Sequence, residues 1–525
     1  MADPSDAGRL PIEGYPDRWS YAPGETVAVA ASSRSPTFSV EVARVGGSRE
    51  IIWTRGDVPG QWHPVAADAA SKGCDWPESF RFTIPADQRS GYCEVVLRGV
   101  DERTGRLTEG RAFFVVRPPA GVPRPAGAML LVLATNTYNA YNDWGGPSLY
   151  TGATRVSFRR PLAPGFLRKP EPHVRYPNVT DLDDPEHEHF RSWADLHGLA
   201  RWSGSAGWHN WERVFVRWAE REGYRVDVAV NSDLEFHPEV LDGYQLAVSV
   251  GHDEYWSWGM RDALEGFIAG GGNAAFFSGN TVCWQVRYED DAATMVCFKS
   301  AVRDDPVFGT DRQHLLSTLW SSALVGRPEN SLTGVSFSRG GYIRMGRAVP
   351  RGTGGYTAWR PGHWAFDSTG ICYGDVFGTA DFVAAYEVDG CEFTLSLDDG
   401  LPAPTGRDGT PEGFTILATA PARLWSRDEL PSRYRSDELG DLESTAEAVF
   451  GAASPENIAR LSHNHAVMGT YTNGGTVFTA GTTDWAYGLA GQDPDIMKIT
   501  RNVIDRLSAR RTAAGKGRPR PASPS

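Results

Sequence analysis

The sequence predicts an α/β protein whose N-terminal part is an all-β sandwich domain. Two observations predict this fold class. Residues 12–117 consist of short alternating runs separated by turn residues about every ten positions, a pattern typical of β-sandwiches. From residue 129 onward, apolar runs of buried-strand length alternate with amphipathic helical patterns. That alternation indicates a mostly parallel sheet with helices on both faces.

The N-terminal strands are predicted from period-two alternation. In residues 38–43, FSVEVA, apolar and polar side chains alternate strictly, so one face of that strand is expected to be buried. The expected strands are residues 26–31, 38–43, 51–54, 80–84, 94–97 and 112–116. Four prolines between residues 118 and 128 then indicate a stiff linker, because proline fixes φ and favours extended backbone.

The α/β region follows this linker. Its strands are predicted from continuous apolar runs at residues 129–134, 225–230, 244–250, 273–277 and 477–480. One helix is predicted over residues 211–221 because Trp211, Val214, Phe215 and Trp218 recur at helical spacing. Further helices are expected over residues 256–269 and 496–507.

Three parts of the α/β region interrupt this alternation. Residues 135–210 are too rich in proline, histidine and charge to form one regular element, so we interpret them as an active-site insertion. Residues 482–489, TTDWAYGL, are expected to form a loop. Beyond residue 290, an antiparallel extension of the sheet is predicted from the runs 331–337, 342–347, 382–386 and 393–397.

Length and composition bound the organisation of the chain. At 525 residues and 57.3 kDa it is too long for one core, and roughly three or four folding units are expected. The expected division is a flexible N-terminus (1–11), a β-sandwich (12–117), a linker (118–128), an α/β domain with insertions (129–508) and a disordered tail (509–525).

Charge, cysteines and motifs exclude several classes of protein. The net charge of −13 argues against nucleic acid or an anionic membrane as the main partner. The six cysteines form no CxxC pair, and neither a signal peptide nor an apolar run of membrane-spanning length is visible, so a cytoplasmic location is expected. The GxSxG, GxxxxGK[ST] and HExxH motifs are absent from the sequence, as is a strand followed by GxGxxG.

Candidate site residues follow the predicted strands. Ligands of open α/β sheets bind beyond the carboxyl ends of the strands, where the loops 135–150, 251–256 and 278–280 begin. The middle loop, GHDEYW, brings together the residue types of a proton relay or a metal site in His252, Asp253 and Glu254. The alternative is that Asp253 or Glu254 caps the next helix and that His252 is a surface group.

The loop 135–150 offers Tyr138, Tyr141 and Tyr150. Tyrosine titrates at about pH 10, so a phenolate ligand at neutral pH requires a strong Lewis acid such as ferric iron. The alternative is ordinary aromatic packing. Gly145 and Gly146 permit a tight reversal that would return Tyr150 towards Tyr141.

Five further residues lie outside these two groups. Asn280 follows a strand end and is either a donor to an oxyanion or a turn residue, and Glu387 is a candidate for the same cleft. His187 and His189 lie in DLDDPEHEHF, where a solvated loop is favoured over a metal site. Cys283 has no evident base nearby and is interpreted as structural.

Several segments, taken in order, resemble the family of the N,N-dimethylformamidase large (β) subunit. They are TYNAYNDWGGPSLY, VGHDEYWS, GGNAAFFSGNTVCW, YEVDG and TAGTTDWAYGL with ITRNVIDRL, and the resemblance covers about residues 129–508. It implies a core similar to class I glutamine amidotransferases and a mononuclear Fe(3+) centre that hydrolyses a formamide. Where such a fold would carry a cysteine nucleophile, this chain has GHDEYW.

The resemblance also implies roles for individual residues. The implied iron ligands are Tyr141, Tyr150 and Glu254, with Tyr138 as a competitor for Tyr141, and the implied catalytic residues are His252, Asn280 and Glu387. In that mechanism, metal-activated water attacks the metal-polarised carbonyl. His252 or Glu387 protonates the departing amine, because an amide nitrogen leaves poorly without a proton.

We therefore expect an iron-dependent hydrolase that cleaves the C–N bond of a small or N-substituted amide. Two alternatives stay open. One is acyl or amide transfer in a biosynthetic pathway with the same metal site. The other is a non-catalytic protein that binds carbohydrate or protein, which 18 tryptophans and a sandwich domain would suit. A homo-oligomer and a small partner subunit are also left open.

Overall fold

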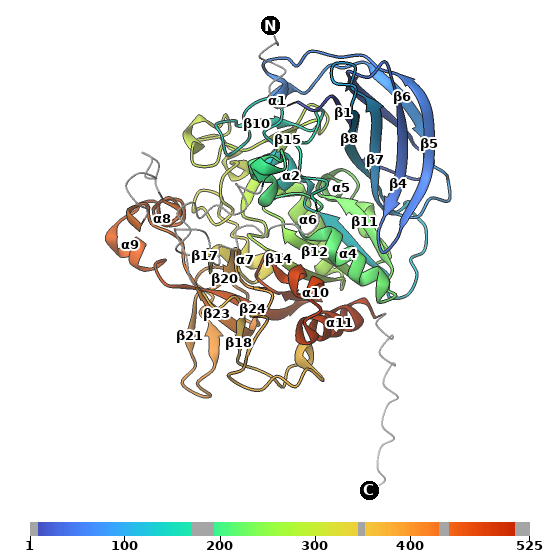
Figure 1. The fold of residues 1–525 in the computed structure, drawn as a ribbon. Helices are drawn as coiled ribbons and strands as arrows, with labels where there is room; N and C mark the ends of the chain where they lie inside the picture. The colour runs from blue at the N-terminus through green and yellow to red at the C-terminus, as the bar shows by residue number, and fades with distance from the viewer. Residues whose placement is uncertain (1–8, 171–193, 345–351, 430–439, 510–525) are drawn as a thin grey trace.

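The fold is that of a computed structural model, which describes residues 9–170, 194–344, 352–429 and 440–509. Figure 1 shows a β region, formed by the N-terminal part of the chain and drawn in blue, lying against a larger α/β body. The predicted flexible ends, 1–11 and 509–525, fall largely outside the described residues. The proline-rich stretch 118–128, which lies between the two parts, contains neither helix nor strand.

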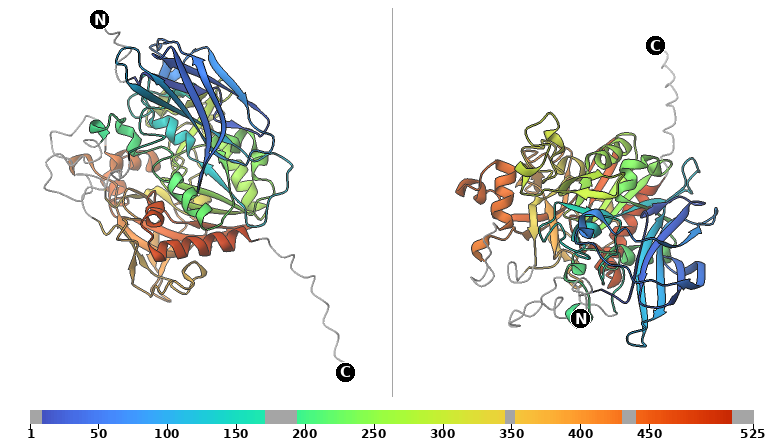
Figure 2. Two further views of the ribbon diagram at one scale, coloured as in Figure 1. Left: turned by 45° about the vertical axis from the view of Figure 1, so that its right-hand side comes forward. Right: turned by 90° about the horizontal axis from the view of Figure 1, so that it is seen from above.

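The N-terminal region is built from two packed sheets, which lie along one side of the molecule (Figure 2). One sheet has the order β1-β3-β6 and the other the order β2-β8-β7-β4-β5. Alternate side chains of each strand, such as Val27 and Val29 of β3 and Val40 and Val42 of β4, are buried in the core that both sheets share. The strands are β1 (Ile12–Pro16), β2 (Ser20–Tyr21), β3 (Thr26–Ser33), β4 (Thr37–Val45), β5 (Arg49–Pro59), β6 (Glu78–Thr83), β7 (Gly91–Val100) and β8 (Leu107–Val116), with the short helix α1 (Ala69–Lys72) between β5 and β6.

The α/β body is organised by a nine-stranded sheet in the order β11-β9-β12-β14-β25-β24-β23-β18-β19. Its first five strands are parallel, and each overlaps one of the five predicted buried runs. The remaining strands are antiparallel. The bounds are β9 (Met129–Leu133), β11 (Val226–Val230), β12 (Leu246–His252), β14 (Asn273–Gly279), β18 (Tyr356–Ala358), β19 (Val376–Phe377), β23 (Thr415–Ala422), β24 (Asn464–Asn473) and β25 (Gly475–Thr479).

Helices cover both faces of the parallel half, because successive strand side chains point to opposite sides. Leu131 and Leu133 of β9 share a buried cluster with α4 (Glu212–Arg221) and α11 (Pro494–Ser508). Leu130 and Val132 share another with α6 (Trp258–Ala269). The other helices named below are α2 (Thr135–Tyr141), α5 (Asn231–Phe236), α8 (Asp441–Phe450) and α10 (Trp485–Ala490).

The predicted antiparallel extension was wrong in its strands. The run predicted at 331–337 overlaps only the first two residues of β17 (Ser336–Tyr342), and the run 382–386 ends directly before β20 (Glu387–Gly390). These two strands pair with each other outside the nine-stranded sheet. The run 393–397 contains β21 (Phe393–Leu395), which pairs with β22 (Pro402–Pro404), and the run 342–347 lies partly outside the described residues. The extension is formed by β18, β19, β23 and β24. Strands as short as β18 and β19 contain too few residues to show an alternation of apolar and polar side chains.

Two segments predicted as irregular are helical. Residues 482–489, predicted as a loop, contain most of α10, and the insertion 135–210 opens with α2. Trp485, Ala486 and Leu489 of α10 are buried. Both helices are only six or seven residues long. Tertiary burial rather than an amphipathic repeat stabilises helices of this length.

The β-sandwich is fixed to the α/β body by buried polar and aromatic contacts. Glu220 of α4 accepts hydrogen bonds from Arg44 at 2.5 Å, from Arg89 at 2.8 Å and from the backbone N–H of Gly47 at 2.6 Å. The Arg44 and Glu220 side chains are only 4% and 9% exposed. The two parts therefore share one buried ion-pair network.

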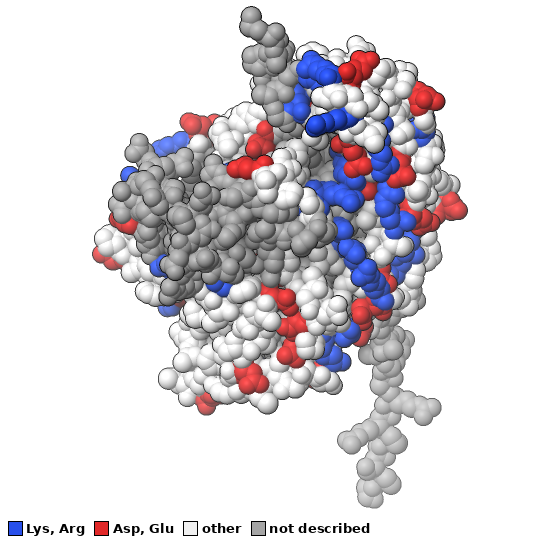
Figure 3. All heavy atoms as spheres, in the orientation of Figure 1, with Lys and Arg blue, Asp and Glu red and all other residues white. Residues whose placement is uncertain are grey.

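The surface of the sandwich is polar. In Figure 3, basic and acidic side chains are interspersed over the part of this face that the N-terminal domain forms. The strands of the sandwich carry the ion pairs Arg49–Glu41 and Arg98–Glu109. Within the described ranges, we find no helix that is both long and apolar enough to span a bilayer.

The Glu220 network gives the first prediction. Glu220→Gln should lower the free energy of unfolding by about 3 kcal/mol, because the buried Arg44 guanidinium and the partly exposed Arg89 guanidinium lose their carboxylate. Urea denaturation measures this change. The matched control is Glu222→Gln on the same helix end, where Glu222 pairs with Arg501 at the surface and the expected loss is below about 1 kcal/mol. Equal losses in the two variants would contradict the buried network.

Candidate functional site

The predicted site residues converge at the carboxyl edge of the parallel strands. β12 ends at His252, two residues before Glu254, and β14 ends at Gly279, directly before Asn280. Glu387 is the first residue of β20, and its carbonyl accepts a hydrogen bond from the loop that follows β25. The carboxyl ends of neighbouring parallel strands meet at one edge, so residues far apart in the sequence become neighbours here.

Glu254 is the centre of one half of this site. Its Oε1 atom accepts hydrogen bonds from the Tyr150 hydroxyl at 2.5 Å and from the Trp284 indole N–H at 2.8 Å. The Tyr255 hydroxyl donates to the Tyr150 oxygen at 2.9 Å. The other carboxylate atom, Oε2, lies 3.3 Å from His252 Nε2 as an ion pair, but it is buried and accepts no hydrogen bond from a described residue.

The structure distinguishes Tyr141 from Tyr138, the two candidates for the same implied iron ligand. The Tyr141 ring stacks on the Tyr150 ring with their centroids 4.1 Å apart and lies 5.6 Å from the His252 ring. Tyr138 points away from this group, and its hydroxyl donates to Glu212 at 2.7 Å. Tyr141, rather than Tyr138, therefore lies beside Tyr150 and the carboxylate of Glu254.

The chain returns from Tyr141 to Tyr150 through the predicted reversal. Gly145 and Gly146 have φ values of 75° and 146°, which glycine tolerates and other residues rarely adopt. After the turn, the Leu149 N–H donates to the Ala140 carbonyl at 3.0 Å. This hydrogen bond ties the end of the loop to α2.

His252 joins the two halves of the site. Its Nε2 atom lies 2.7 Å from Glu387 Oε2. Its Nδ1 atom lies 2.7 Å from the Ser205 carbonyl oxygen. A carbonyl oxygen can only accept, so Nδ1 carries a proton and Nε2 faces the two carboxylates. The Asn280 amide nitrogen lies 3.3 Å from both His252 Nε2 and Glu387 Oε2, which places all four polar residues in one cluster.

The charges of this cluster depend on one another. Burial alone would lower the pKa of His252, but the negative charges of Glu387 and Glu254 outweigh it and raise that pKa well above the usual range. Burial would likewise raise the pKa of Glu254, yet the charges of His252 and Lys299 leave it lower than usual. The two neighbouring glutamates therefore favour the protonated form of the His252 imidazole.

Asn280 sits in a strained turn that Asp389 holds. Asn280 and Val282 have φ values of 50° and 57°, and for a β-branched residue such as Val282 this is a costly conformation. The Asp389 carboxylate accepts hydrogen bonds from the backbone N–H groups of Asn280 at 2.9 Å and Thr281 at 3.1 Å. Asp389 is two residues after Glu387 on β20, so both side chains project from the same side of that strand.

Lys299 is the main site residue that sequence analysis missed. Its Nζ atom lies 3.2 Å from the centroid of the Tyr150 ring and 5.1 Å from that of Trp284. Burial lowers the pKa of Lys299, although the charge of Glu254 opposes this effect. Its backbone φ of 52° is unusual for a lysine. No sequence motif marked this lysine, because it follows the three-residue strand β16 (Thr294–Val296) rather than one of the long buried strands.

Asp253 and Cys283 have other surroundings than the polar cluster. Asp253 points to the opposite side of the loop, where it accepts hydrogen bonds from Asn231 at 3.1 Å and Ser249 at 2.8 Å, and burial raises its pKa to about 6. Cys283 is buried, and burial raises its pKa well above the usual range, as expected of a structural thiol. His187 and His189 lie outside the described residues.

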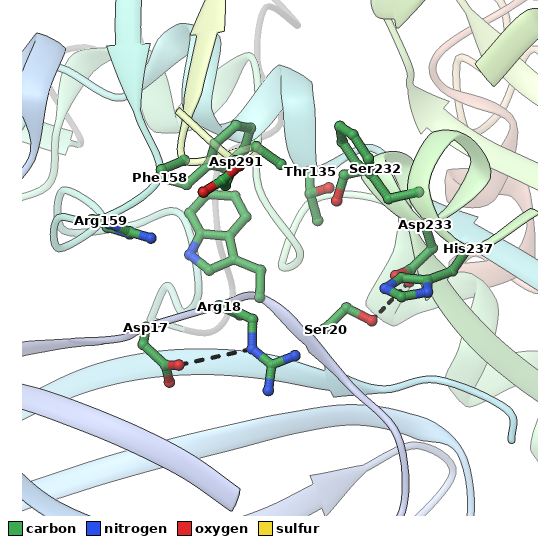
Figure 4. A pocket seen from close by; sticks show the side chains of 14 residues that line it. Asp17, Arg18, Ser20, Thr135, Phe158, Arg159, Ser232, Asp233, His237 and Asp291 are labelled. Atoms are coloured by element: carbon green, nitrogen blue, oxygen red, sulfur yellow. Dashed lines mark hydrogen bonds and ion pairs between the residues drawn. The ribbon is translucent and has the colours of Figure 1, made fainter. Parts of the chain in front are cut away.

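A cavity of about 480 Å³ lies apart from this cluster, where the N-terminal domain meets the carboxyl ends of β9 and β11 (Figure 4). Thr135 and Ser232 follow those strands and line one part of the cavity, whereas Arg159 lies across from them. Ser20 of the sandwich donates to Asp233 at 2.8 Å on this boundary. The residues lining it include none of the predicted site residues.

Comparisons with known proteins connect the whole arrangement to one family. The profile described as N,N-dimethylformamidase beta subunit-like, C-terminal, matches residues 39–498. The chain is 24% identical over 459 residues to the N,N-dimethylformamidase beta subunit of Alcaligenes sp, which covers 83% of this chain and 54% of the relative. It is also 24% identical over 486 residues to the subunit of the same name from Paracoccus aminophilus, covering 82% and 54%. The chain spans about half the length of these curated relatives.

Among solved structures, a family 123 glycoside hydrolase from Clostridium perfringens matches 23% of this chain and 27% of its own. The identity is 8% and the TM-score is 0.10, so this likeness carries no argument about fold or function.

The hydrogen bond from Tyr138 to Glu212 gives the second prediction. Burial raises the pKa of Glu212, its partner, from 4.5 to about 8. The folded protein therefore keeps a proton that the unfolded chain releases above pH 4.5. The stability that this bound proton contributes to the folded protein is fully present below pH 4.5 and is lost as the pH rises to about 8.

Glu212→Gln keeps the acceptor for the Tyr138 hydroxyl and removes the titration. The variant should gain stability relative to the wild type as the pH rises from 5 to 8, on the order of 3 kcal/mol in total. Urea denaturation across that range measures the difference. The same pH dependence in both proteins would show that Glu212 does not titrate in the folded state.

Proposed function

The chain belongs to the N,N-dimethylformamidase beta subunit-like family, and on that premise we propose that it hydrolyses the C–N bond of a small or N-substituted amide. We propose further that a mononuclear ferric ion, held by Tyr141, Tyr150 and Glu254, takes part in this reaction. The supporting observation is the meeting of these three side chains with His252 and Glu387 in one cluster at the carboxyl edge of the sheet.

The residues present fit a hard, highly charged cation. Two phenolate oxygens and a carboxylate are the oxygen donors that such an ion prefers, and together they offset its charge. Glu254 Oε2 and Asn280 Oδ1 are buried acceptors that no described residue satisfies, and buried polar atoms normally have a partner. When bound, iron would polarise the amide carbonyl and make water a better nucleophile.

The proposed set of ligands differs from the sets found in commoner protein metal sites. Across the described ranges, groups of three or more His, Cys, Asp and Glu side chains suited to a metal ion are absent. The proposed set contributes a single carboxylate and two tyrosines, so it is a different kind of site. Its two tyrosines come from α2 and from the loop behind it, and its glutamate follows β12.

The remaining polar residues of the cluster move protons and orient the substrate. The Ser205 carbonyl fixes the Nδ1–H of His252, which directs Nε2 and its proton towards Glu387 at 2.7 Å. This pair can deliver a proton to the departing amine, which an amide nitrogen needs in order to leave. The Asn280 amide, held by the Asp389 turn, can hydrogen-bond a substrate placed against the pair.

A partner subunit belongs to the same proposal. Both curated relatives are named beta subunits, which supports an enzyme that also contains a second kind of chain. The location of the protein in the cytoplasm stays a prediction of the sequence.

The metal assignment gives a third prediction. Glu254→Ala should abolish stoichiometric iron, the visible tyrosinate-to-iron absorption band and amide hydrolysis, while circular dichroism stays that of the wild type. The matched control is Tyr138→Phe, which removes a buried hydroxyl engaged with Glu212 and should keep iron and colour. Elemental analysis and visible absorption measure both. Full iron content and turnover in Glu254→Ala would defeat the ligand assignment.

The proton-transfer pair gives a fourth prediction. Glu387→Gln should retain iron but lower kcat for N,N-dimethylformamide about 10²- to 10⁴-fold, the range for loss of a general acid–base group. Glu289→Gln, at a surface pair with Arg155, should leave kcat unchanged.

Adding hydroxylamine during turnover separates hydrolysis from transfer. Formate as the main product supports hydrolysis, whereas a hydroxamate as the main product would favour the transferase alternative.

A further inference from the structure

We propose that Tyr255 is a positioning residue for the metal site, whose hydroxyl holds the Tyr150 oxygen and tunes its strength as a ligand. This inference rests on the proposed function, because it concerns the same iron centre. It adds a residue that neither the motifs of the sequence nor the family resemblance assigned.

Tyr255 is fixed beside the cluster by its backbone. It opens β13 (Tyr255–Ser257), directly after Glu254, and its side chain is fully buried. Strand β13 pairs in parallel with β15 (Trp284–Glu289), and in that register Tyr255 lies opposite Trp284, which donates to Glu254. The Tyr255 carbonyl also accepts a hydrogen bond from the Asn136 side chain at 2.9 Å. The ring therefore has little freedom to move away from Tyr150.

The direction of the hydrogen bond decides what Tyr255 can do. The Tyr150 hydroxyl has one proton, and it is directed to Glu254 Oε1 at 2.5 Å. In the contact between the two tyrosines, 2.9 Å long, Tyr255 must therefore be the donor. If the Tyr150 oxygen binds a cation in place of its proton, the Tyr255 O–H still points at that oxygen. Partners of this kind orient metal ligands and adjust their donor strength.

A second group acts on Tyr150 from another direction. The Lys299 ammonium lies over the face of the ring, 3.2 Å from its centroid, whereas it is 5.4 Å from the Tyr255 ring. Lys299 thus contacts the π face of Tyr150, and Tyr255 contacts its oxygen. Removing the Tyr255 hydroxyl alone leaves the lysine in place, so its effect can be measured separately.

The test compares Tyr255→Phe with the wild type in a titration with ferric iron, followed by visible absorption. The lost hydrogen bond raises the energy of the phenolate lone pairs, so the charge-transfer band of the variant should lie at longer wavelength. Iron should still bind stoichiometrically at saturation, with an affinity about 10- to 100-fold weaker. The matched control is Tyr356→Phe, which removes another fully buried hydroxyl, donated to the Ala480 carbonyl at 2.7 Å, and should shift neither quantity.

Three outcomes would overturn the inference, and they differ from one another. A variant band and affinity equal to those of the wild type would show that Tyr255 has no influence on the ligand. Complete loss of iron binding in folded Tyr255→Phe would make Tyr255 a ligand itself. A wild-type protein that binds no ferric iron would remove the proposed function together with this inference.

A measurement on the wild type keeps the inference testable if Tyr255→Phe fails to fold. Resonance Raman spectra excited in the charge-transfer band report the C–O stretch of the ligating phenolate. Iron-loaded protein refolded in D₂O should show this stretch shifted from its position in H₂O, because the hydrogen bond to the oxygen becomes a deuterium bond. Identical positions in both solvents would overturn the proposal.

Discussion

Three ionisable side chains buried in the interior, Glu254, Glu387 and His252, are stable there only because each compensates the charge of another. An isolated buried charge costs several kcal/mol, and close pairing with good geometry is what offsets that cost. The imidazole Nε2 lies 2.7 Å from one carboxylate and 3.3 Å from the other, and Nδ1 is satisfied by a backbone carbonyl. The surrounding elements can be understood as the scaffold that holds this contact.

The central sheet and a strand outside it contribute different parts of that scaffold. The parallel strands β12 and β14 deliver His252, Glu254 and Asn280 at their carboxyl ends. Strand β20, outside the sheet, approaches from the other side with Glu387 and the Asp389 carboxylate that holds the turn at Asn280. Strained backbone of this kind persists only where its surroundings determine it, and at Asn280 the Asp389 carboxylate is part of those surroundings.

The β-sandwich supports the same cluster indirectly. Tyr92 of the sandwich stacks on Trp208 with ring centroids 4.1 Å apart, three residues along the chain from Ser205, whose carbonyl orients His252. Trp211 of the same segment packs edge-on to the His252 ring. The family match begins at residue 39, inside the sandwich, so the two regions occur together in that family. Packing of the sandwich therefore constrains the segment that sets the imidazole orientation.

Local patterns in the sequence predicted six of the eight strands of the sandwich, the five buried parallel strands and the helices α4, α6 and α11, whereas β1 and β2 were not predicted. The loops after the parallel strands, and hence His252, Glu254 and Asn280, followed from the rule that such strands end at one edge. Only the tertiary structure shows that Tyr141, rather than Tyr138, lies beside Tyr150, because both lie on the seven-residue helix α2 and differ in which distant carboxylate or ring they meet. Long-range packing also determines the short strands β18 and β19, the buried helix α10 and the positions of Tyr255 and Lys299. Such packing produces no periodic pattern of apolar residues in the sequence.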